Sequence, residues 1–216
     1  IRQLKRAIDS VISQSYTNWE IIVVDDNSED PPVDLIDSYK NANIKLIQLK
    51  TKTNAAFARN VGIEASRGEF VALLDSDDEW MSHHLKKRLD LFQKNPEVDG
   101  IYGSAYKLSN GIKIPFISRP TGREESMLEY LLSGSLRACT PSLTLKKKAI
   151  ADTMFDDSLK QHQDYDFNVR FSRKYKYHCD EDPSVIIHVD DDKRMGKNVQ
   201  HQSCLKFIST YSDEIS

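Results

Sequence analysis

The apolar run 70–74 passes directly into three carboxylates, those of Asp75, Asp77 and Asp78. A run of this length, with Gly68 before it and polar residues after it, is typical of a strand buried on both faces of a sheet. Ligands of open α/β sheets bind beyond the carboxyl ends of the strands, and clustered like charges repel one another unless a cation or hydrogen-bond donors lie among them. The pattern predicts a divalent metal site here, with a polar turn that caps the next helix as the alternative.

A second apolar run, 19–24, ends in Asp25 and Asp26. Helical spacing of apolar residues occurs in the segments 1–16, 31–40 and 54–66, and 44–49 is a further strand. The alternation of strands and helices predicts a parallel, doubly wound sheet with right-handed crossovers, which places both acidic clusters at the same edge. The first helix begins without a cap residue, so we expect a first strand upstream of Ile1.

The second half of the chain predicts a mixed sheet. Asn110 and Gly111 between the segments 98–108 and 112–117 are a strong hairpin signal, and Pro115 places the second strand at an edge. Further helices are expected at 82–95, 124–133 and 164–174, and short strands at 142–145 and 185–188. We therefore predict an α/β fold with a mixed, mainly parallel sheet flanked by helices.

Composition narrows the class of protein. A chain of 216 residues with a net charge of −3 and interspersed signs is expected to form one domain, and it offers no basic field for nucleic acid. Three distant cysteines, Cys139, Cys179 and Cys204, suggest neither a disulfide framework nor a zinc site, which favours a reducing cytoplasm. No apolar run is long enough to span a bilayer and no signal peptide is present, so we expect a soluble protein; peripheral contact with the inner face of the membrane stays open.

Several motifs occur in an order that resembles the inverting glycosyltransferases of family two, which have the GT-A fold and use nucleotide sugars. The motifs are 9–16 (DSVISQSY), 20–28 (EIIVVDDNS), 58–62 (ARNVG), 68–78 (GEFVALLDSDD) and the pair Gln163-Asp164. The resemblance covers nearly the full length. It implies a nucleotide-sugar-binding half at 1–108, an acceptor-binding half at 109–189 and a mobile C-terminal segment at 190–216.

The resemblance implies a donor site made of two acidic pairs and an arginine. Asp26, with Asp25 beside it, matches the acid that hydrogen-bonds the nucleotide base, and an Asx turn is the structural alternative for both. The stretch Asp75-Ser76-Asp77 matches the family's DxD motif, in which Asp77 ligates the metal and Asp75 approaches the ribose and the metal. The implied cofactor is Mn²⁺ or Mg²⁺.

Three further residues complete the implied nucleotide-sugar and acceptor sites. Arg59 is implied to stabilise the nucleotide or its diphosphate, with a paired structural charge as the alternative. Asp164 aligns with the family's catalytic base, although Gln163 replaces the glutamate that usually precedes it. The alternatives are a helix-terminal acid at Asp164 and Asp166 as the base. Trp80 is expected to form a wall of the acceptor cleft, with a side chain that fills the core as the alternative.

These expectations combine into a metal-dependent transferase that moves a hexose or N-acetylhexosamine from a UDP-sugar to a hydroxyl of a saccharide or glycoconjugate, in polysaccharide biosynthesis. Two alternatives stay open, a non-catalytic sugar-nucleotide-binding module and a receiver-like signalling domain. The sequence leaves open which sugar is donated, which acceptor is used and which oligomeric state the chain adopts. A homo-oligomer is one of the open states. The sequence also leaves open whether His188 and the tail residues Lys193, Arg194 and Lys197 contact the diphosphate.

Overall fold

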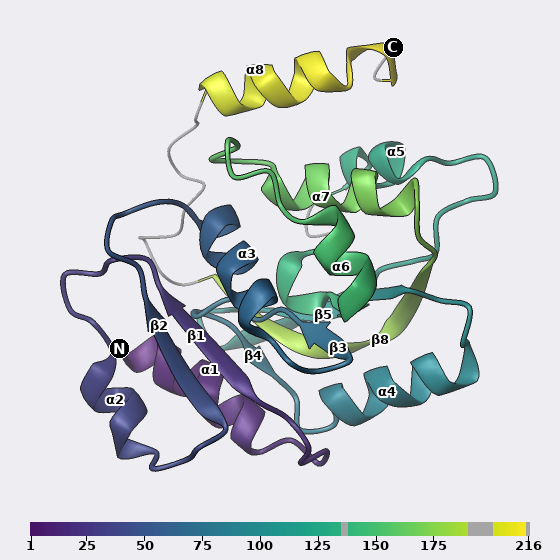
Figure 1. The fold of residues 1–216 in the computed structure, drawn as a ribbon. Coiled ribbons are helices and arrows are strands. Elements are labelled where there is room, and N and C mark those ends of the chain that lie inside the picture. The colour runs from purple at the N-terminus through teal and green to yellow at the C-terminus, as the bar shows by residue number, and fades with distance from the viewer. Residues whose placement is uncertain (135–137, 190–200, 215–216) are drawn as a thin grey trace.

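The computed structural model describes residues 1–134, 138–189 and 201–214, and it shows two separate sheets with helices around them (Figure 1). The smaller sheet contains only β1 (Ile21–Asp25) and β2 (Ile44–Gln48), which pair in parallel. Three helices accompany it: α1 (Arg2–Ile12), α2 (Val33–Ser38) and α3 (Ala55–Ala65). Ile8, Ile36 and Ile44 form the apolar cluster that holds this part together.

The larger sheet has six strands in the order β3-β7-β5-β8-β4, with β6 paired to β5. The strands are β3 (Phe70–Ala72), β4 (Glu79–Trp80), β5 (Gly100–Ser109), β6 (Ile112–Phe116), β7 (Thr144–Lys146) and β8 (Tyr177–His188). Five helices lie between or after these strands in the chain: α4 (His84–Lys94), α5 (Met127–Leu132), α6 (Lys147–Thr153), α7 (Gln163–Ser172) and α8 (His201–Thr210). Short 3-10 helices occur at Thr140–Ser142 and Ser212–Glu214.

The prediction of an α/β fold with a mixed sheet is confirmed, but its parallel character needs correction. β1 with β2 and β5 with β8 pair in parallel, whereas the other four pairings among the described strands are antiparallel. The strand that precedes the acid cluster, β3, pairs antiparallel with β7. Of the parallel pairings expected up to residue 74, the described residues show that of β1 with β2, while the described neighbour of β3 is β7, a strand more than seventy residues later in the chain.

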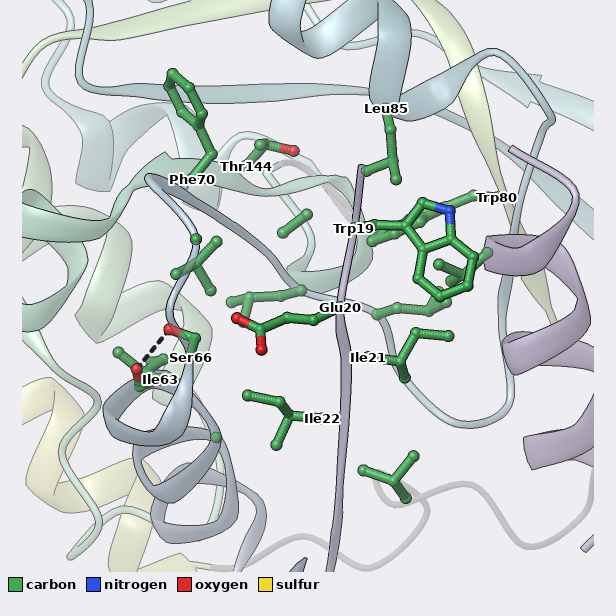
Figure 2. A pocket seen from close by; sticks show the side chains of 18 of the residues that line it. Trp19, Glu20, Ile21, Ile22, Ile63, Ser66, Phe70, Trp80, Leu85 and Thr144 are labelled. Carbon is green, nitrogen blue, oxygen red and sulfur yellow. Dashed lines mark hydrogen bonds between the residues drawn. The ribbon is translucent and has the colours of Figure 1, made fainter. Parts of the chain in front are cut away.

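A cavity of about 910 Å³ lies between β1 and β3 (Figure 2). Apolar side chains make up much of its lining, among them Trp19, Ile21, Ile22 and Phe70. Within the described part of the chain β1 pairs only with β2 and β3 only with β7, so no ladder of hydrogen bonds crosses this space. The strand expected upstream of Ile1 stays a prediction.

The hairpin is confirmed in its position and in its turn chemistry. Asn110 and Gly111 connect β5 to β6 with φ angles of 48° and 76°, the left-handed values that a type I′ turn requires at both central positions. Glycine adopts such an angle without a steric penalty and asparagine tolerates it, which is why this dipeptide marks hairpins.

A buried ion pair ties α4 to the larger sheet. The Arg88 side chain is fully buried and donates to Asp180 Oδ2 at 2.7 Å, and Lys87 Nζ lies 2.7 Å from Asp180 Oδ1. A Cβ atom on Gly103 would lie 2.5 Å from the Arg88 guanidinium, so glycine is needed where β5 passes it. His84 is also fully buried, and its Nδ1 lies 2.8 Å from Ser184 Oγ.

The C-terminal residues 201–214 belong to the segment 190–216, whose mobility stays a prediction. They form α8 and a short 3-10 helix, and α8 lies along the outer side of α7 in Figure 1. Phe207 and Tyr211 are only 4% and 1% exposed, so these two aromatic side chains anchor the segment in the core. The predicted tail residues Lys193, Arg194 and Lys197 lie outside the described residues.

Candidate active site

Arg59 is the side chain that joins the acid cluster after β3 to the start of α7. The helix α3 that carries it is capped by Asn54, whose side chain accepts from Phe57 N at 3.0 Å. Arg59 donates from NH2 to Asp75 Oδ1 at 2.8 Å and from NH1 to Gln163 Oε1 at 3.1 Å. Sequence positions separated by 104 residues thereby become neighbours, and the Arg59 side chain is only 20% exposed.

Asp164 lies in the first turn of α7, next to Gln163. Burial raises the pKa of the Asp164 carboxyl above its ordinary value, the Arg59 guanidinium opposes the rise, and the carboxylate of Asp75 adds to it. One oxygen also accepts from the Tyr165 backbone N–H at 3.0 Å. Asp75, Arg59 and Asp164 thus act on one another electrostatically, which places the predicted donor acid and the predicted base in one site.

Asp166, the competing candidate for the base, has a structural role in this fold. Its carboxylate forms an ion pair with Arg170 at 2.7 Å and accepts from the Tyr211 hydroxyl at 2.8 Å. The residue is only 5% exposed. Because both oxygens are engaged and buried, Asp166 is a poorer candidate than Asp164 for taking a proton from an acceptor.

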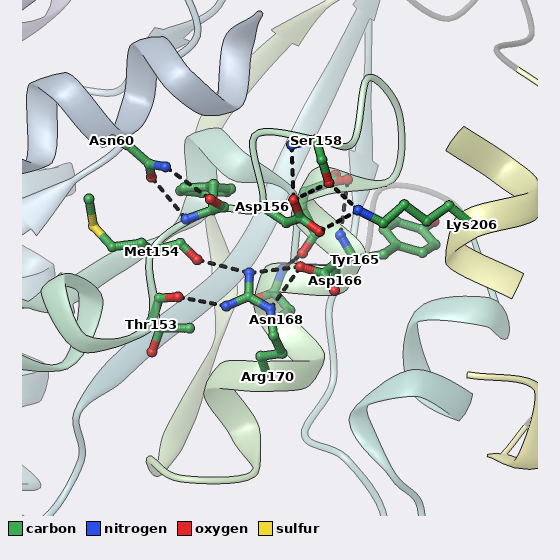
Figure 3. Close-up of polar contacts among 12 residues, drawn as sticks. Asn60, Thr153, Met154, Asp156, Ser158, Tyr165, Asp166, Asn168, Arg170 and Lys206 are labelled. Atoms are coloured by element: carbon green, nitrogen blue, oxygen red, sulfur yellow. Dashed lines mark hydrogen bonds and ion pairs between the residues drawn. The ribbon is translucent and has the colours of Figure 1, made fainter. Parts of the chain in front are cut away.

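The loop that precedes α7, the helix that carries Asp164, is held from two sides, as Figure 3 shows. Asn60 of α3 exchanges two hydrogen bonds of 2.9 Å with the backbone of Phe155, and Arg170 donates to the carbonyls of Thr153 and Met154. From the other side, Lys206 of α8 lies 3.2 Å from Asp156 Oδ2. Residues 153–156 are therefore held by α3 and α7 on one side and by α8 on the other.

Asp25 and Asp26, at the end of β1, have different environments. Asp25 is buried and accepts from Ser28 N, three residues on, at 3.2 Å, whereas the Asx turn considered as its structural alternative would use the N–H two residues on. Asp26 accepts through Oδ1 from both the backbone N–H and the hydroxyl of Thr53, at 2.7 and 2.6 Å. Lys52 Nζ lies 3.5 Å from Asp26 Oδ2. Thr53 was not singled out in the sequence, since nothing in its local pattern distinguishes it.

The three residues after Asp75 divide between exposed and buried positions. Ser76 is exposed, and the turn is closed by the Asp78 N–H donating to the Asp75 carbonyl at 3.1 Å. Asp78 is 2% exposed and accepts from His188 N at 2.9 Å, so it orients β8 beside the site. The Asp77 carbonyl accepts from the Arg6 guanidinium of α1.

Asp75 and Asp77 carry the oxygen atoms that suit a hard divalent cation. Among the described residues no three His, Cys, Asp or Glu side chains converge on one point. Mg²⁺ is commonly held by only one or two carboxylates, with the phosphates of the substrate and water completing its shell. The donor set after β3 therefore fits Mg²⁺ or Mn²⁺ in the presence of a diphosphate.

Trp80 and Cys139 are two buried residues close to the acid cluster in sequence or in electrostatic effect. Trp80 is only 6% exposed, stacks on His84 with 4.5 Å between ring centroids and donates to the Pro141 carbonyl at 2.8 Å. The expected acceptor-cleft wall is thus a core residue. Cys139 was not predicted here, yet burial raises the pKa of its thiol to about 12 and the carboxylates of Asp78 and Asp75 add to the rise.

Comparison with known proteins follows the same motifs. The sequence profile of the family described as "Glycosyl transferase family 2" matches residues 2–154. The amylovoran biosynthesis glycosyltransferase AmsB of Erwinia amylovora is 34% identical over 173 residues, which cover 76% of this chain and 57% of the relative. The Escherichia coli protein named UDP-Glc:alpha-D-GlcNAc-diphosphoundecaprenol beta-1,3-glucosyltransferase WfgD is 34% identical over 111 residues, covering 51% and 43%. The chain thus spans about half the length of these curated relatives.

Solved structures share the fold. S. aureus TarS 1-349 in complex with UDP-GlcNAc superposes with a TM-score of 0.73 at 22% identity, over 91% of this chain and 57% of that chain. The same protein in complex with UDP gives a TM-score of 0.69 at 23% identity, over 86% and 56%. In the described residues of our chain, every helix is too short or too polar to cross a membrane.

Proposed function

Because the chain belongs to glycosyltransferase family 2, we propose that it transfers a hexose or N-acetylhexosamine from a UDP-sugar to a hydroxyl of a saccharide or glycoconjugate, with inversion at the anomeric carbon. The observation that carries this proposal is the bridge from Asp75 through Arg59 to Gln163, the neighbour of Asp164. A direct displacement needs the donor diphosphate and a base on opposite sides of one carbon. The bridge supports such a geometry.

On the donor side, Asp26 is the proposed partner of the nucleotide base. Thr53 occupies Oδ1 of this carboxylate, and Oδ2 faces Lys52, whose side chain is 68% exposed. An exposed lysine is readily displaced, since surface ion pairs contribute about 0–1 kcal/mol. A uracil N3–H donating to Oδ2 would form a charge-assisted hydrogen bond in its place.

Asp77 and Asp75 are the proposed ligands of a Mn²⁺ or Mg²⁺ ion that is shared with the diphosphate. When bound, such an ion neutralises charge on the departing nucleoside diphosphate. Arg59 lies where its guanidinium supplements that charge, because it already contacts Asp75. These assignments agree with the donor set described above and depend on the family resemblance for the individual roles.

On the acceptor side, Asp164 is the proposed general base. Its carboxylate takes the proton of the acceptor hydroxyl while that oxygen bonds to the anomeric carbon and the bond from this carbon to the diphosphate oxygen breaks. The raised pKa of Asp164 suits this task, since a base is most effective when its pKa approaches the working pH. The neutral Gln163 pairs with Arg59 without adding a second negative charge beside the base.

The names of the relatives support the donor and acceptor classes. TarS has been solved with UDP and with UDP-GlcNAc, and WfgD is named for a UDP-glucose donor. The receiver-like alternative is set aside because the family match extends over residues 2–154. A sugar-nucleotide-binding module without transfer remains the second candidate, which Gln163 in place of a glutamate favours.

The decisive experiment is a UDP-release assay over a panel of UDP-sugars, with and without Mn²⁺ and with candidate saccharide acceptors. We expect metal-dependent release from one donor, abolished in Asp77→Asn and Asp164→Asn while circular dichroism shows intact folding. Binding of UDP measured by calorimetry, with no release from any donor, would assign the chain to the binding module. Full activity in either variant would remove that residue from its proposed role.

A further inference from the structure

The end of the β5–β6 hairpin, residues 107–117, is called the arm, and no described part of the chain covers its exposed side chains. Every residue from 111 to 115 is exposed, and Ile112, Ile114 and Ile117 have exposed fractions of 63%, 55% and 53%. Of the ten large apolar side chains exposed in the described residues, three lie within the six positions 112–117. Single exposed apolar residues are ordinary, whereas a cluster on one projecting element marks an interaction surface.

The charge of the arm is entirely basic. No acidic residue occurs between positions 100 and 122, whereas Lys107, Lys113 and Arg119 lie in this stretch of a chain with a net charge of −3. Lys107 is directly opposite Ile114 in the hairpin and therefore shares its face, while Lys113 is opposite Leu108. Neither lysine forms an ion pair with any residue that the structure describes. Apolar side chains flanked by lysines complement an anionic lipid surface, which attracts the charges and accepts the isoleucines.

A second copy of the chain is a poorer occupant of the same surface. The outer edge of β6 contains Pro115, which has no N–H to donate to a neighbouring strand. Antiparallel pairing of two β6 strands centred near Lys113 would also place two lysines opposite each other, which is destabilising. Proline and lysine are the residues by which edge strands avoid such pairing.

The arm lies at the same end of the sheet as the acid cluster. Pro115 pairs with Tyr106, Tyr106 with Ile186 and Ile186 with Glu79, so three strand spacings, about 15 Å, separate the arm from the strand that directly follows Asp78. A surface that received the isoleucines would therefore lie close to the candidate active site.

We propose that this arm docks the protein onto an anionic lipid bilayer, with Ile112 and Ile114, which share one face of β6, entering the boundary between headgroups and acyl chains, and with Lys107 on the same face and Lys113 on the other contacting the headgroups. The docking brings the acid cluster close to the bilayer surface. It rests on the hairpin alone and holds whether or not the chain transfers a sugar.

Co-sedimentation with vesicles tests the proposal. The wild-type chain is expected to bind vesicles of phosphatidylcholine mixed with phosphatidylglycerol and to bind vesicles of phosphatidylcholine alone far less, with binding that weakens as salt is raised. Ile112→Ser/Ile114→Ser should lower the partition coefficient at least about tenfold. Lys107→Gln/Lys113→Gln should remove most of the preference for the anionic vesicles. Leu205→Ser/Ile208→Ser, which changes an exposed apolar pair on α8, outside the hairpin, is the matched control and should bind like wild type.

Several results would overturn the proposal. They are the absence of wild-type binding, equal binding of both vesicle types, and loss of binding only in the α8 control. A concentration-dependent dimer, detected by light scattering and abolished by the hairpin substitutions, would assign the surface to a second copy instead. Thermal unfolding of each variant should match wild type, since the substituted side chains are exposed.

Discussion

Replacing Arg59 tests whether its guanidinium couples Asp75 to α7, the helix that carries Asp164. Arg59→Lys retains a positive charge but reaches only one of Asp75 and Gln163, because an ammonium lacks the planar fork that contacts both. A hydrogen bond to a charged partner contributes about 1.5–3 kcal/mol and a neutral one about 0.5–1.5 kcal/mol. Since the pair is partly exposed, we take the lower part of these ranges, a loss of about 2 kcal/mol.

A loss of about 2 kcal/mol in transition-state stabilisation lowers kcat/KM roughly thirtyfold for Arg59→Lys, measured by UDP release under saturating metal. The Arg59 charge holds down the pKa of Asp164, so Arg59→Gln should in addition move the acidic limb of the pH profile to higher pH. Arg67→Lys is the matched control, because the Arg67 side chain is 80% exposed and pairs only with Glu20 among the described residues. Wild-type kcat/KM and an unmoved acidic limb in both Arg59 variants would refute the coupling.

Three further predictions concern stability. Arg88→Met leaves Asp180 buried with Lys87 as its remaining cation and should lower the free energy of unfolding in urea by about 3 kcal/mol, with part of the loss recovered on adding Asp180→Leu; an effect below about 1 kcal/mol would contradict the buried pair. Burial lowers the pKa of His84 well below 6.5, so His84 is neutral in the folded state and protonates on unfolding. The free energy of unfolding should therefore fall by about 1.4 kcal/mol per pH unit below about pH 6.5. Urea unfolding of His84→Phe at the same pH values should lack this contribution to the slope. Tyr211→Phe removes the hydroxyl that donates a hydrogen bond to Asp166. It should lower the free energy of unfolding, measured by thermal unfolding, by about 1 kcal/mol and leave UDP binding unchanged.

Local patterns in the sequence were sufficient where the structure depends on neighbouring residues. Asn110-Gly111 fixes its hairpin through two φ angles, and Asn54 caps α3 through a contact three residues away. Gly62 lets α3 approach β1 closely, since a Cβ atom there would lie 3.4 Å from the Val24 side chain. Chemistry of this kind is encoded within a few positions of the chain.

Pairings between distant segments escaped the sequence analysis. The place of β7 beside β3 and the contact of Arg59 with Gln163 depend on tertiary packing that no local period records. Trp80 shows the same limit, because its position after an acid cluster suggested an acceptor contact, whereas the packing of α4 buries it against His84. The individual roles of Asp26, Asp77 and Asp164 stay predictions that the proposed assays address.

The pairing of β1 with β2 has a consequence for how this part of the molecule opens. Among the strands that the structure describes, β1 and β2 pair only with each other, and their amide protons should exchange through a local opening. The amides of β5 and β8, in the middle of the larger sheet, should exchange only on global unfolding. A nucleotide that contacts Asp26 at one end and Asp77 at the other would span both units. Slowed amide exchange in β1 and β2 would then report substrate binding directly.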